Sequence, residues 1–365
     1  MDIQRFEDRK KHHIQSSLDS KNQAIGLSGF DQIELVHDAL PDLNFEEVSL
    51  EINSLGKTRN TPFFVAGMTA GHPDAFSMNR TLAERAAARG WWMGVGSQRR
   101  QLERNSDLVD QWKELRRSVP ELVLISNLGI SQLILSDLDQ VKGIVDSIHA
   151  NAIVIHLNAL QEVIQEEGTP QFRGGWTALE KLVKKMSIPV LVKETGCGFS
   201  KRTLRRLQEM GVSAVDVSGL GGTHWGRIEG DRTTSHSLKS ASETFKNWGI
   251  STYDSLLHAM EVLTGSQTEY WASGGIRTGL DAAKALVLGA KGVGFAQPAL
   301  EKALLGAEEL ELWMERIEYE LKVALFCTGC KNIVELRTQF PVKGMEEGIE
   351  WDLSPIKISK TDLSY

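Results

Sequence analysis

Three loop segments in the second half of the chain have the composition of phosphate-binding loops. They are SGLGGT at 218–223, SGGIRTG at 273–279 and the pair Ala296-Gln297, and each follows a short apolar run and precedes a helical pattern. Backbone N–H groups in such loops, with the positive end of the next helix dipole, can bind a phosphate. Arg277 could add a bidentate contact. Glycines that merely make tight turns would explain any one loop, but three successive loops favour phosphate binding.

A lysine stands at the end of the apolar run in VLVKETG, residues 190–196. A buried lysine needs a partner, or its pKa falls. Lys193 could form a Schiff base with a carbonyl substrate, or it could stabilise the anionic reduced ring of a flavin. A structural ion pair with a carboxylate on a neighbouring strand is the third possibility. The residues alone leave all three open.

The segment HLNALQE, residues 156–162, gathers polar groups after another apolar run. Glu162 and Asn158 offer oxygen ligands of the kind that Mg²⁺ takes, alongside substrate phosphate and water. His156 could bind a diphosphate. The alternative is a helix-capping asparagine followed by a solvated glutamine and glutamate.

A basic cluster of Arg9, Lys10 and His13 stands near the N-terminus of a chain whose net charge is -7. A solvated helix surface is the simpler explanation of that cluster in isolation. Trp225 lies just beyond the SGLGGT loop, where its ring could wall a site. Cys327 and Cys330 have the spacing of a redox or metal pair, but no second pair exists, and we assign them no function.

Alternating short apolar runs and amphipathic stretches must position these residues. Strands are expected at 63–66, 92–96, 122–127, 152–156, 190–194, 214–218, 270–273 and 292–296. Helices are expected between them, for example at 74–89, and again after the last unit at 308–325. Eight such units without a strand hairpin favour a closed (β/α)8 TIM barrel, an α/β fold, over an open doubly wound sheet. Active sites of these barrels lie at the carboxyl ends of the strands, which is where the unusual residues fall.

The chain is expected to divide into three parts. Residues 1–60, which have dense charge and weak periodicity, form an extended N-terminal segment and a lid over the substrate. Residues 61–340 form the barrel with its added C-terminal helices, and residues 341–365 form a tail. The acidic net charge argues against a nucleic-acid partner, and no stretch has the length and hydrophobicity of a membrane helix. The three cysteines and the polar N-terminus, which does not resemble a signal peptide, favour a reducing, cytoplasmic setting.

These motifs, in the order in which they occur along about residues 5–340, resemble those of type 2 isopentenyl-diphosphate isomerase. That family is an FMN-dependent enzyme of isoprenoid synthesis. The family usually has glycine in place of Ala70, and Cys197 is also unusual for it. The resemblance implies that substrate is bound by Arg9, Lys10, His13, Ser97, Gln98, Arg99, His156, Gln161 and Trp225, with Glu162 and Asn158 on the metal. It implies that FMN is bound by Gly67, Met68, Thr69, Ser97, Asn127, Lys193, Ser218, Thr223, Gly274, Gly275, Ile276, Arg277, Ala296 and Gln297.

The resemblance also implies a mechanism. Isopentenyl and dimethylallyl diphosphate interconvert when a proton is added at C4 of the substrate and one is removed from C2. Reduced FMN would be the acid–base group through its N5 atom, with Mg²⁺ on the diphosphate, NADPH as reductant and a homo-oligomeric enzyme. Two alternatives are an FMN-dependent 2-hydroxy-acid oxidase and a non-catalytic barrel that binds a phosphate ligand. The oxidase needs a late His-Gly-x-Arg pattern, which the sequence lacks. The binding barrel does not explain Lys193, the 156–162 motif and the N-terminal cluster together.

Overall fold

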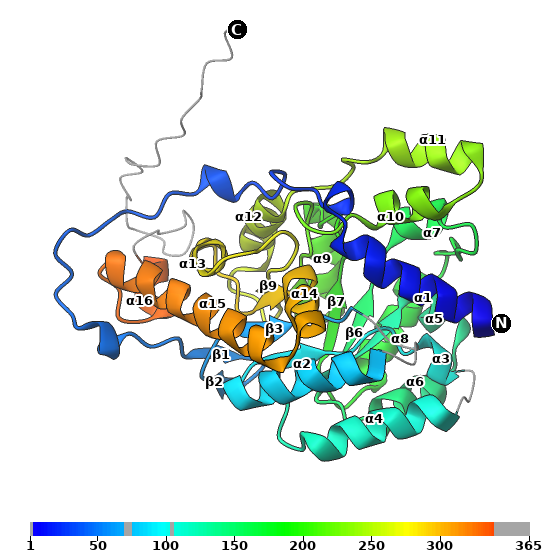
Figure 1. Ribbon diagram of the computed structural model, residues 1–365, viewed down its shortest axis with the longest axis horizontal. Helices are drawn as coiled ribbons and strands as arrows, with labels where there is room; N and C mark the ends of the chain where they lie inside the picture. Colours follow the sequence, from blue (N-terminus) through cyan, green and yellow to red (C-terminus); the bar gives the residue numbers. More distant parts are fainter. Residues whose placement is uncertain (1–2, 69–74, 103–105, 339–365) are drawn as a thin grey trace, which may run out of the picture.

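The protein is a closed barrel of parallel strands surrounded by helices (Figure 1). The computed structural model describes residues 3–68, 75–102 and 106–338, with side chains left out at 3–8, 10 and 106–108. Thr69, Ala70 and the expected tail at 341–365 lie outside this part of the chain.

The eight strands of the barrel are short and follow one another around its axis. They pair in the order β10-β3-β4-β5-β6-β7-β8-β9, and a parallel bridge between Ala272 and Val293 closes the ring. The expected TIM barrel is therefore confirmed, and the open sheet is excluded. The strands are β3 (Phe63–Val65), β4 (Trp92–Gly94), β5 (Leu124–Gly129), β6 (Ala152–His156), β7 (Val190–Lys193), β8 (Ala214–Asp216), β9 (Glu269–Trp271) and β10 (Val293–Phe295).

Helices surround the strands, and several further helices extend the basic pattern. Between β8 and β9 the chain makes a long excursion that carries three helices, so this strand end has the most elaborate cover. The α-helices are α1 (Ile3–Leu18), α2 (Ala75–Arg89), α3 (Arg99–Leu102), α4 (Ser106–Ser118), α5 (Ile130–Leu135), α6 (Leu138–Ser147), α7 (Ala159–Ile164), α8 (Gly175–Lys185), α9 (Lys201–Met210), α10 (Trp225–Arg232), α11 (His236–Thr244), α12 (Thr252–Leu263), α13 (Gly279–Val287), α14 (Gln297–Leu305), α15 (Ala307–Cys327) and α16 (Ile333–Thr338). The helix expected at 308–325 is α15. No helix in the described ranges combines the length and the apolar character needed to span a bilayer.

The N-terminal segment differs from the expectation of an extended chain. Residues 3–18 form the helix α1, and the remainder is mostly irregular, with three short 3-10 turns, η1 (Ser20–Asn22), η2 (Phe30–Gln32) and η3 (Phe45–Glu47). An unexpected antiparallel hairpin follows, made by β1 (Ile52–Ser54) and β2 (Lys57–Arg59). Charged residues dominate α1 and mask its apolar spacing, so the sequence pattern was weak.

The hairpin closes the amino-terminal end of the barrel. Glu269 at the start of β9 accepts hydrogen bonds from the Ser54 hydroxyl at 2.7 Å and from the N–H of Leu55 at 2.8 Å. The guanidinium of Arg59 lies 4.0 Å from the centroid of the Trp92 ring inside the barrel. This end is thereby filled with side chains, which leaves the carboxyl ends of the strands as the place for a site.

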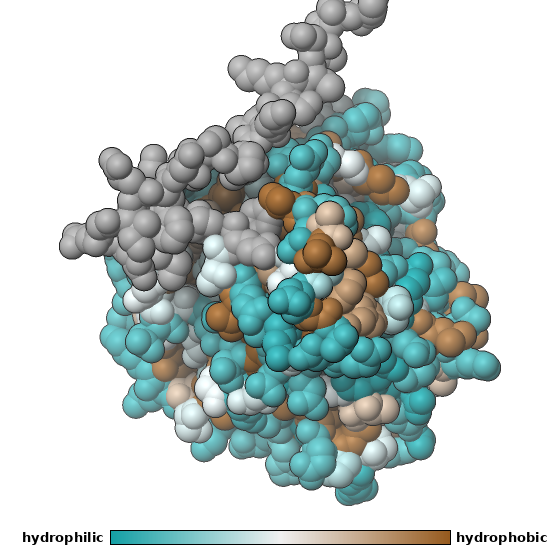
Figure 2. Space-filling model, turned by 90° about the vertical axis from the view of Figure 1, so that its left-hand side faces the viewer, coloured by the Kyte–Doolittle hydropathy of each residue, from teal (hydrophilic) through white to brown (hydrophobic). Residues whose placement is uncertain are grey.

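Two apolar layers hold the barrel together. The interior is filled by large side chains such as Phe64, Trp92 and Trp271, and the second layer lies between the strands and the helices. On the face seen in Figure 2, apolar residues occur in small groups among hydrophilic ones.

Trp91 is the centre of an aromatic cluster in the outer layer. Its ring is 1% exposed and lies 4.9 Å from the Phe63 ring and 5.8 Å from the Trp313 ring on α15, between centroids. Its indole N–H donates to Glu318 at 2.7 Å. The cluster therefore joins the barrel wall to the added helix α15.

Trp91→Ala should lower the free energy of unfolding by about 3–5 kcal/mol, because it leaves a large cavity in a packed layer. Trp248→Ala is the matched control, since that ring is 60% exposed, and it should change the value by no more than about 0.5 kcal/mol. Urea unfolding followed by circular dichroism measures both. Equal stability of the two variants would contradict this description of the core.

Candidate active site

The carboxyl ends of the strands open into two adjoining hollows, which together form a cavity in two parts. The first part, about 1000 Å³ when the portion open to solvent is counted, lies against the loops after β8, β9 and β10. The second part lies against the ends of β4, β5 and β6. The two parts share His13, Gly67, Met68, Lys193, Thr195 and Trp225. A ligand in one part would therefore meet a ligand in the other at Lys193.

The glycine loops make a narrow cradle in the first part. Gly275 has φ 83°, and a Cβ there would lie 2.5 Å from the carbonyl carbon of Gly221, so only glycine permits this approach of two loops. Arg277 NH1 donates to the carbonyl oxygens of Gly221 and Gly275, both at 3.0 Å, and thereby braces the loops against each other. Burial lowers the pKa of Arg277, while Asp281 raises it.

Backbone donors in this cradle are available to a ligand. Within the described part of the chain, nothing accepts a hydrogen bond from the N–H of Gly274, Gly275 or Ile276. The helix α14 begins at Gln297, which also lines the cavity. Unpaired N–H groups beside a helix N-terminus fit a phosphate group, so the cradle fits the phosphate of FMN.

Lys193 lies at the end of β7 between two carboxylates. Its Nζ donates to the carbonyl oxygen of Glu194 at 3.2 Å, and its register partner on β8 is Asp216. Burial lowers the pKa of Lys193, whereas Asp216 and Glu194 raise it. Asp216 is fixed in place because it accepts from the Ser273 hydroxyl at 2.7 Å. The lysine thus faces the cavity beside a carboxylate that is held in place.

Glu194 has a structural role, because its carboxylate accepts hydrogen bonds from backbone N–H groups of its own turn. Burial raises its pKa to about 7, although backbone N–H groups of Cys197, Thr195 and Gly196 and the Lys193 charge lower it. These donors hold the turn that follows β7 in place, which positions Lys193 and Thr195.

The second part of the cavity is lined by polar side chains, several of which hold one another. His156 Nδ1 lies 2.9 Å from Asn127 Oδ1, and the Asn127 amide donates to the carbonyl oxygen of Val95 at 2.9 Å. Glu162 accepts from the Asn158 amide at 2.9 Å and from the N–H of Thr169 at 2.6 Å. The side chains are therefore oriented before any ligand arrives.

The metal-binding potential of this part is limited to oxygen ligands. Among the described residues, no group of three or more His, Cys, Asp or Glu side chains could hold a metal ion. Glu162 with the Asn158 amide fits Mg²⁺ only if water and substrate oxygens complete the coordination, which is the usual arrangement for Mg²⁺ bound with a phosphate.

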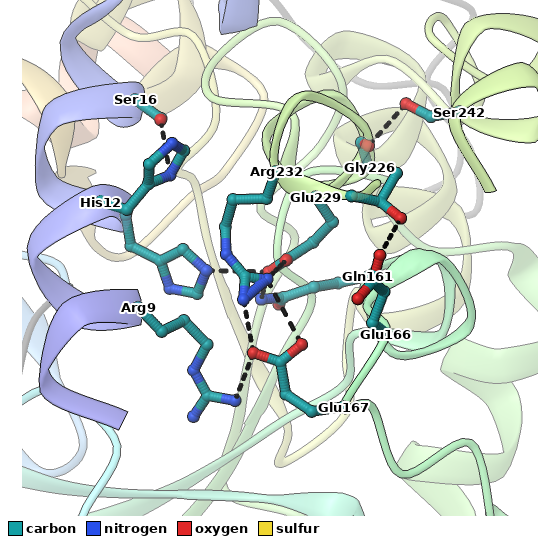
Figure 3. Close-up of polar contacts among 12 residues, drawn as sticks. Arg9, His12, Ser16, Gln161, Glu166, Glu167, Gly226, Glu229, Arg232 and Ser242 are labelled. Carbon is teal, nitrogen blue, oxygen red and sulfur yellow. Dashed lines mark hydrogen bonds and ion pairs between the residues drawn. The ribbon is translucent and has the colours of Figure 1, made fainter. Parts of the chain in front are cut away.

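The helix α1 lines the cavity through Arg9 and His13. Figure 3 shows Arg9 on this helix beside Glu167. His13 Nε2 lies 2.9 Å from Glu229 Oε1 on α10, and Gln161 donates to the same oxygen at 3.1 Å. Arg9 lies 3.5 Å from Glu167, in the connection between α7 and α8. Burial lowers the pKa of Arg9, Glu167 raises it, and the like charge of Arg99 lowers it. Two arginines thus face one polar space, which favours an anionic ligand.

Most residues singled out in the sequence gather around this cavity, although their contacts with cofactor and substrate stay predictions. Gln98 does not line either part, because its amide is buried behind the wall and bonded to Gln101 and Ser126. The side chain of Lys10 is outside the described set, as is Thr69. The lining residues among those predicted are Arg9, His13, Gly67, Met68, Ser97, Arg99, Asn127, His156, Asn158, Gln161, Glu162, Lys193, Ser218, Thr223, Trp225, Gly274, Gly275, Ile276, Arg277, Ala296 and Gln297.

Several polar residues that shape the site were missed. Asp216 and Glu229 are both buried and ionisable, and Arg232 pairs with both Glu229 and Glu167. A partial signal was present, since Glu229 and Arg232 have the i,i+3 spacing of a helical ion pair directly after the SGLGGT loop. Nothing in the sequence indicated that Glu167 would meet them.

Known proteins resemble the chain in both sequence and fold. Residues 132–342 match the model of the FMN-dependent dehydrogenase family. Similar solved structures include a flavocytochrome b2 mutant with benzoylformate, with TM-score 0.66, 19% identity, and coverage of 95% of this chain and 82% of that one. Mandelate oxidase with benzoyl-formic acid has TM-score 0.59 and 18% identity, covering 92% of this chain and 96% of that one. These structures support the fold.

Curated relatives are similar over nearly their whole length. The isopentenyl-diphosphate delta-isomerase of Legionella pneumophila (strain Corby) is 49% identical over 333 residues, which cover 91% of this chain and 96% of the relative. The enzymes of the same name from Bdellovibrio bacteriovorus and Synechocystis sp. are 47% and 39% identical, covering 92% and 93% of this chain and 97% of each relative. The chain therefore belongs to the isopentenyl-diphosphate delta-isomerase family, in its FMN-dependent type 2 form.

Proposed function

We propose that this protein interconverts isopentenyl and dimethylallyl diphosphate for isoprenoid synthesis, with reduced FMN as the acid–base group and Mg²⁺ on the diphosphate. The observation that carries the proposal is the two-part cavity, in which a phosphate cradle and a polar, arginine-bearing pocket meet at Lys193. An enzyme that acts on a diphosphate with a flavin needs two anion sites that converge on one ring.

The first part of the cavity would hold FMN. Its phosphate would lie in the cradle of Gly274, Gly275 and Ile276, and its ring would reach Lys193. When bound, reduced FMN supplies the group that adds a proton at C4 of the substrate and removes one from C2. Lys193 would stabilise the negative charge of the reduced ring, because a nearby cation favours the anionic form. NADPH would reduce the flavin once, so that one NADPH is oxidised per flavin and none per turnover.

The second part would hold the substrate. Arg9, His13 and Arg99 would bind the diphosphate by charge-assisted hydrogen bonds, and His156 would add a fourth contact. Glu162 would bind Mg²⁺ together with Asn158. The hydrocarbon end would then point toward the region shared by the two parts, where Met68 and Trp225 lie.

Exclusion of water is the other requirement, because proton transfer to an unactivated alkene passes through a cation-like state that water would capture. Ile14 on α1 and Trp225 on α10 line the cavity on the side that α1 covers. The helix α1 would thus serve as the lid. Ordering of this lid by substrate, a homo-oligomeric state and a cytoplasmic location stay predictions.

An anaerobic assay with FMN, Mg²⁺, excess NADPH and isopentenyl diphosphate tests the function. Dimethylallyl diphosphate, measured by proton NMR, should form in large molar excess over the NADPH oxidised. Absence of product, or one NADPH oxidised per product, would contradict the proposal. The latter result would instead favour a redox enzyme.

Glu162→Gln should raise the Mg²⁺ concentration needed for turnover by about tenfold or more, since it removes the only carboxylate proposed to bind the metal. FMN affinity, measured by fluorescence quenching, should be unchanged. Glu180→Gln is a control at an exposed carboxylate on α8 that does not line the cavity. An unaltered Mg²⁺ requirement in Glu162→Gln would rule out the metal assignment.

Removing the N-terminal cations should weaken substrate affinity and spare the flavin. Arg9→Ala is expected to raise KM about tenfold or more, because a charge-assisted contact to the diphosphate is lost. The effect of Lys10→Ala should be in the same direction. Normal KM in the double alanine variant would show that α1 does not bind substrate.

Lys193→Met should lower the reduction potential of bound FMN and weaken its binding, because the charge is lost while the shape is roughly kept. A tenfold change in binding corresponds to about 1.4 kcal/mol. Isomerase activity should fall with it. A normal potential and rate in this variant, or a borohydride-trapped substrate adduct on the wild-type lysine, would give Lys193 a different role.

A further inference from the structure

Five charged or ionisable side chains alternate in sign beneath α1. Arg9 contacts Glu167 at 3.5 Å, Glu167 contacts Arg232 NH2 at 2.5 Å, and Arg232 NH1 contacts Glu229 at 2.9 Å. His13 completes the series at 2.9 Å from Glu229. Figure 3 shows Arg232 between the two carboxylates, with Arg9 on the opposite side of Glu167.

Both carboxylates need a positive partner. The side chain of Glu229 is 0% exposed. Burial raises its pKa, but His13, Arg232 and Gln161 outweigh burial, and the net pKa is lowered. Glu229 therefore carries a full negative charge, which a buried site tolerates only when it is compensated. Glu167, 29% exposed, contributes a second negative charge beside Arg9.

Arg232, in the middle of the series, determines which side chains compensate the negative charges of Glu167 and Glu229. Arg232 contacts both carboxylates at once, through different nitrogens, and does not line either part of the cavity. Without it, Arg9 and His13 would be the remaining basic side chains in contact with the two carboxylates in the described part of the chain. Those two side chains would then be held by the carboxylates and would be less available to an anion in the cavity.

We propose that Arg232 is a positioning residue that neutralises Glu167 and Glu229, so that Arg9 and His13 stay available to a diphosphate ligand. This rests on the proposed function, because it assumes that Arg9 and His13 bind a diphosphate. Arg232 itself would act only through the two carboxylates. Its effect should therefore appear in the affinity for an anion and not in flavin binding or in the chemical step.

The competing explanation is that the cluster is only a structural tie, which fastens α10, the α7–α8 connection and α1 to one another. The two explanations predict different effects on anion binding when the charge of Glu167 is removed. If the cluster is a tie, loss of the Glu167 charge should loosen Arg9 and weaken anion binding. If Arg232 sets the charge balance, loss of the Glu167 charge should leave anion binding unchanged or make it tighter.

The test is the affinity of FMN-loaded protein for inorganic pyrophosphate with Mg²⁺, measured by titration calorimetry. Arg232→Gln should weaken pyrophosphate binding about tenfold, a coupling within the range for residues in one ion-pair network. Arg232→Gln combined with Glu167→Gln should recover most of the affinity, and Glu167→Gln alone should bind pyrophosphate at least as tightly as wild type. KM should follow the affinity, while kcat, FMN affinity and the flavin potential change little.

Controls separate this inference from the proposed function. Arg205→Gln removes an exposed arginine on α9 that pairs with Glu261 on α12 and does not line the cavity, and it should bind pyrophosphate as wild type does. If Arg9→Ala weakens pyrophosphate binding and Arg232→Gln does not, the inference fails and the substrate site stands. If the double variant binds more weakly than Arg232→Gln, the tie explanation is correct.

If wild type fails to bind pyrophosphate, both the inference and the proposed function are wrong. Should Arg232→Gln not fold, weaker binding by Glu167→Gln would still overturn the proposal.

Discussion

The arrangement of the site depends on the hydrogen bonds and ion pairs around the ionised carboxylate of Glu229. A buried carboxylate is stable only where donors surround it. Here the donors come from α1, α7 and α10, through His13, Gln161 and Arg232. The same group therefore fastens the N-terminal helix, orients a residue of the 156–162 motif and anchors the long excursion after β8. Three segments distant in sequence meet at one charge, and together they cover part of the open end of the barrel.

The barrel supplies the other half of the arrangement. Its short strands all run in the same direction, so their carboxyl ends deliver Lys193, His156 and the glycine loops to one mouth. The loops after β8 and β9 approach so closely that side chains would collide, which leaves backbone N–H groups directed at the cavity. Asp216 and Ser273 then fix the surroundings of Lys193 from the neighbouring strands. This geometry gives the cavity a region suited to an anion in each of its two parts, with the cation Lys193 between them.

The strands and their order could be predicted from sequence because each is a short apolar run with a turn behind it. Residues at strand ends, such as Lys193 and His156, were predictable for the same reason. Other features were not. The helical face of α1 is hidden among charged residues, and the roles of Glu229 and Glu167 depend on contacts across more than 60 residues of sequence. Gln98 was misplaced in the expected site because one residue of a strand-end loop turned inward and bonded to the wall. Local pattern specifies elements and their ends, whereas it does not specify which distant charges will pair.

The central claim is that α1 is part of the diphosphate site and not merely packed on the barrel. Hydrogen exchange of the FMN-loaded protein, followed by mass spectrometry with and without pyrophosphate and Mg²⁺, tests this most directly. We expect slower exchange in the amides of α1 around residues 9–18 when pyrophosphate binds, with little change in the outer helix α15. Pyrophosphate binding that leaves the exchange of α1 unaltered would contradict it.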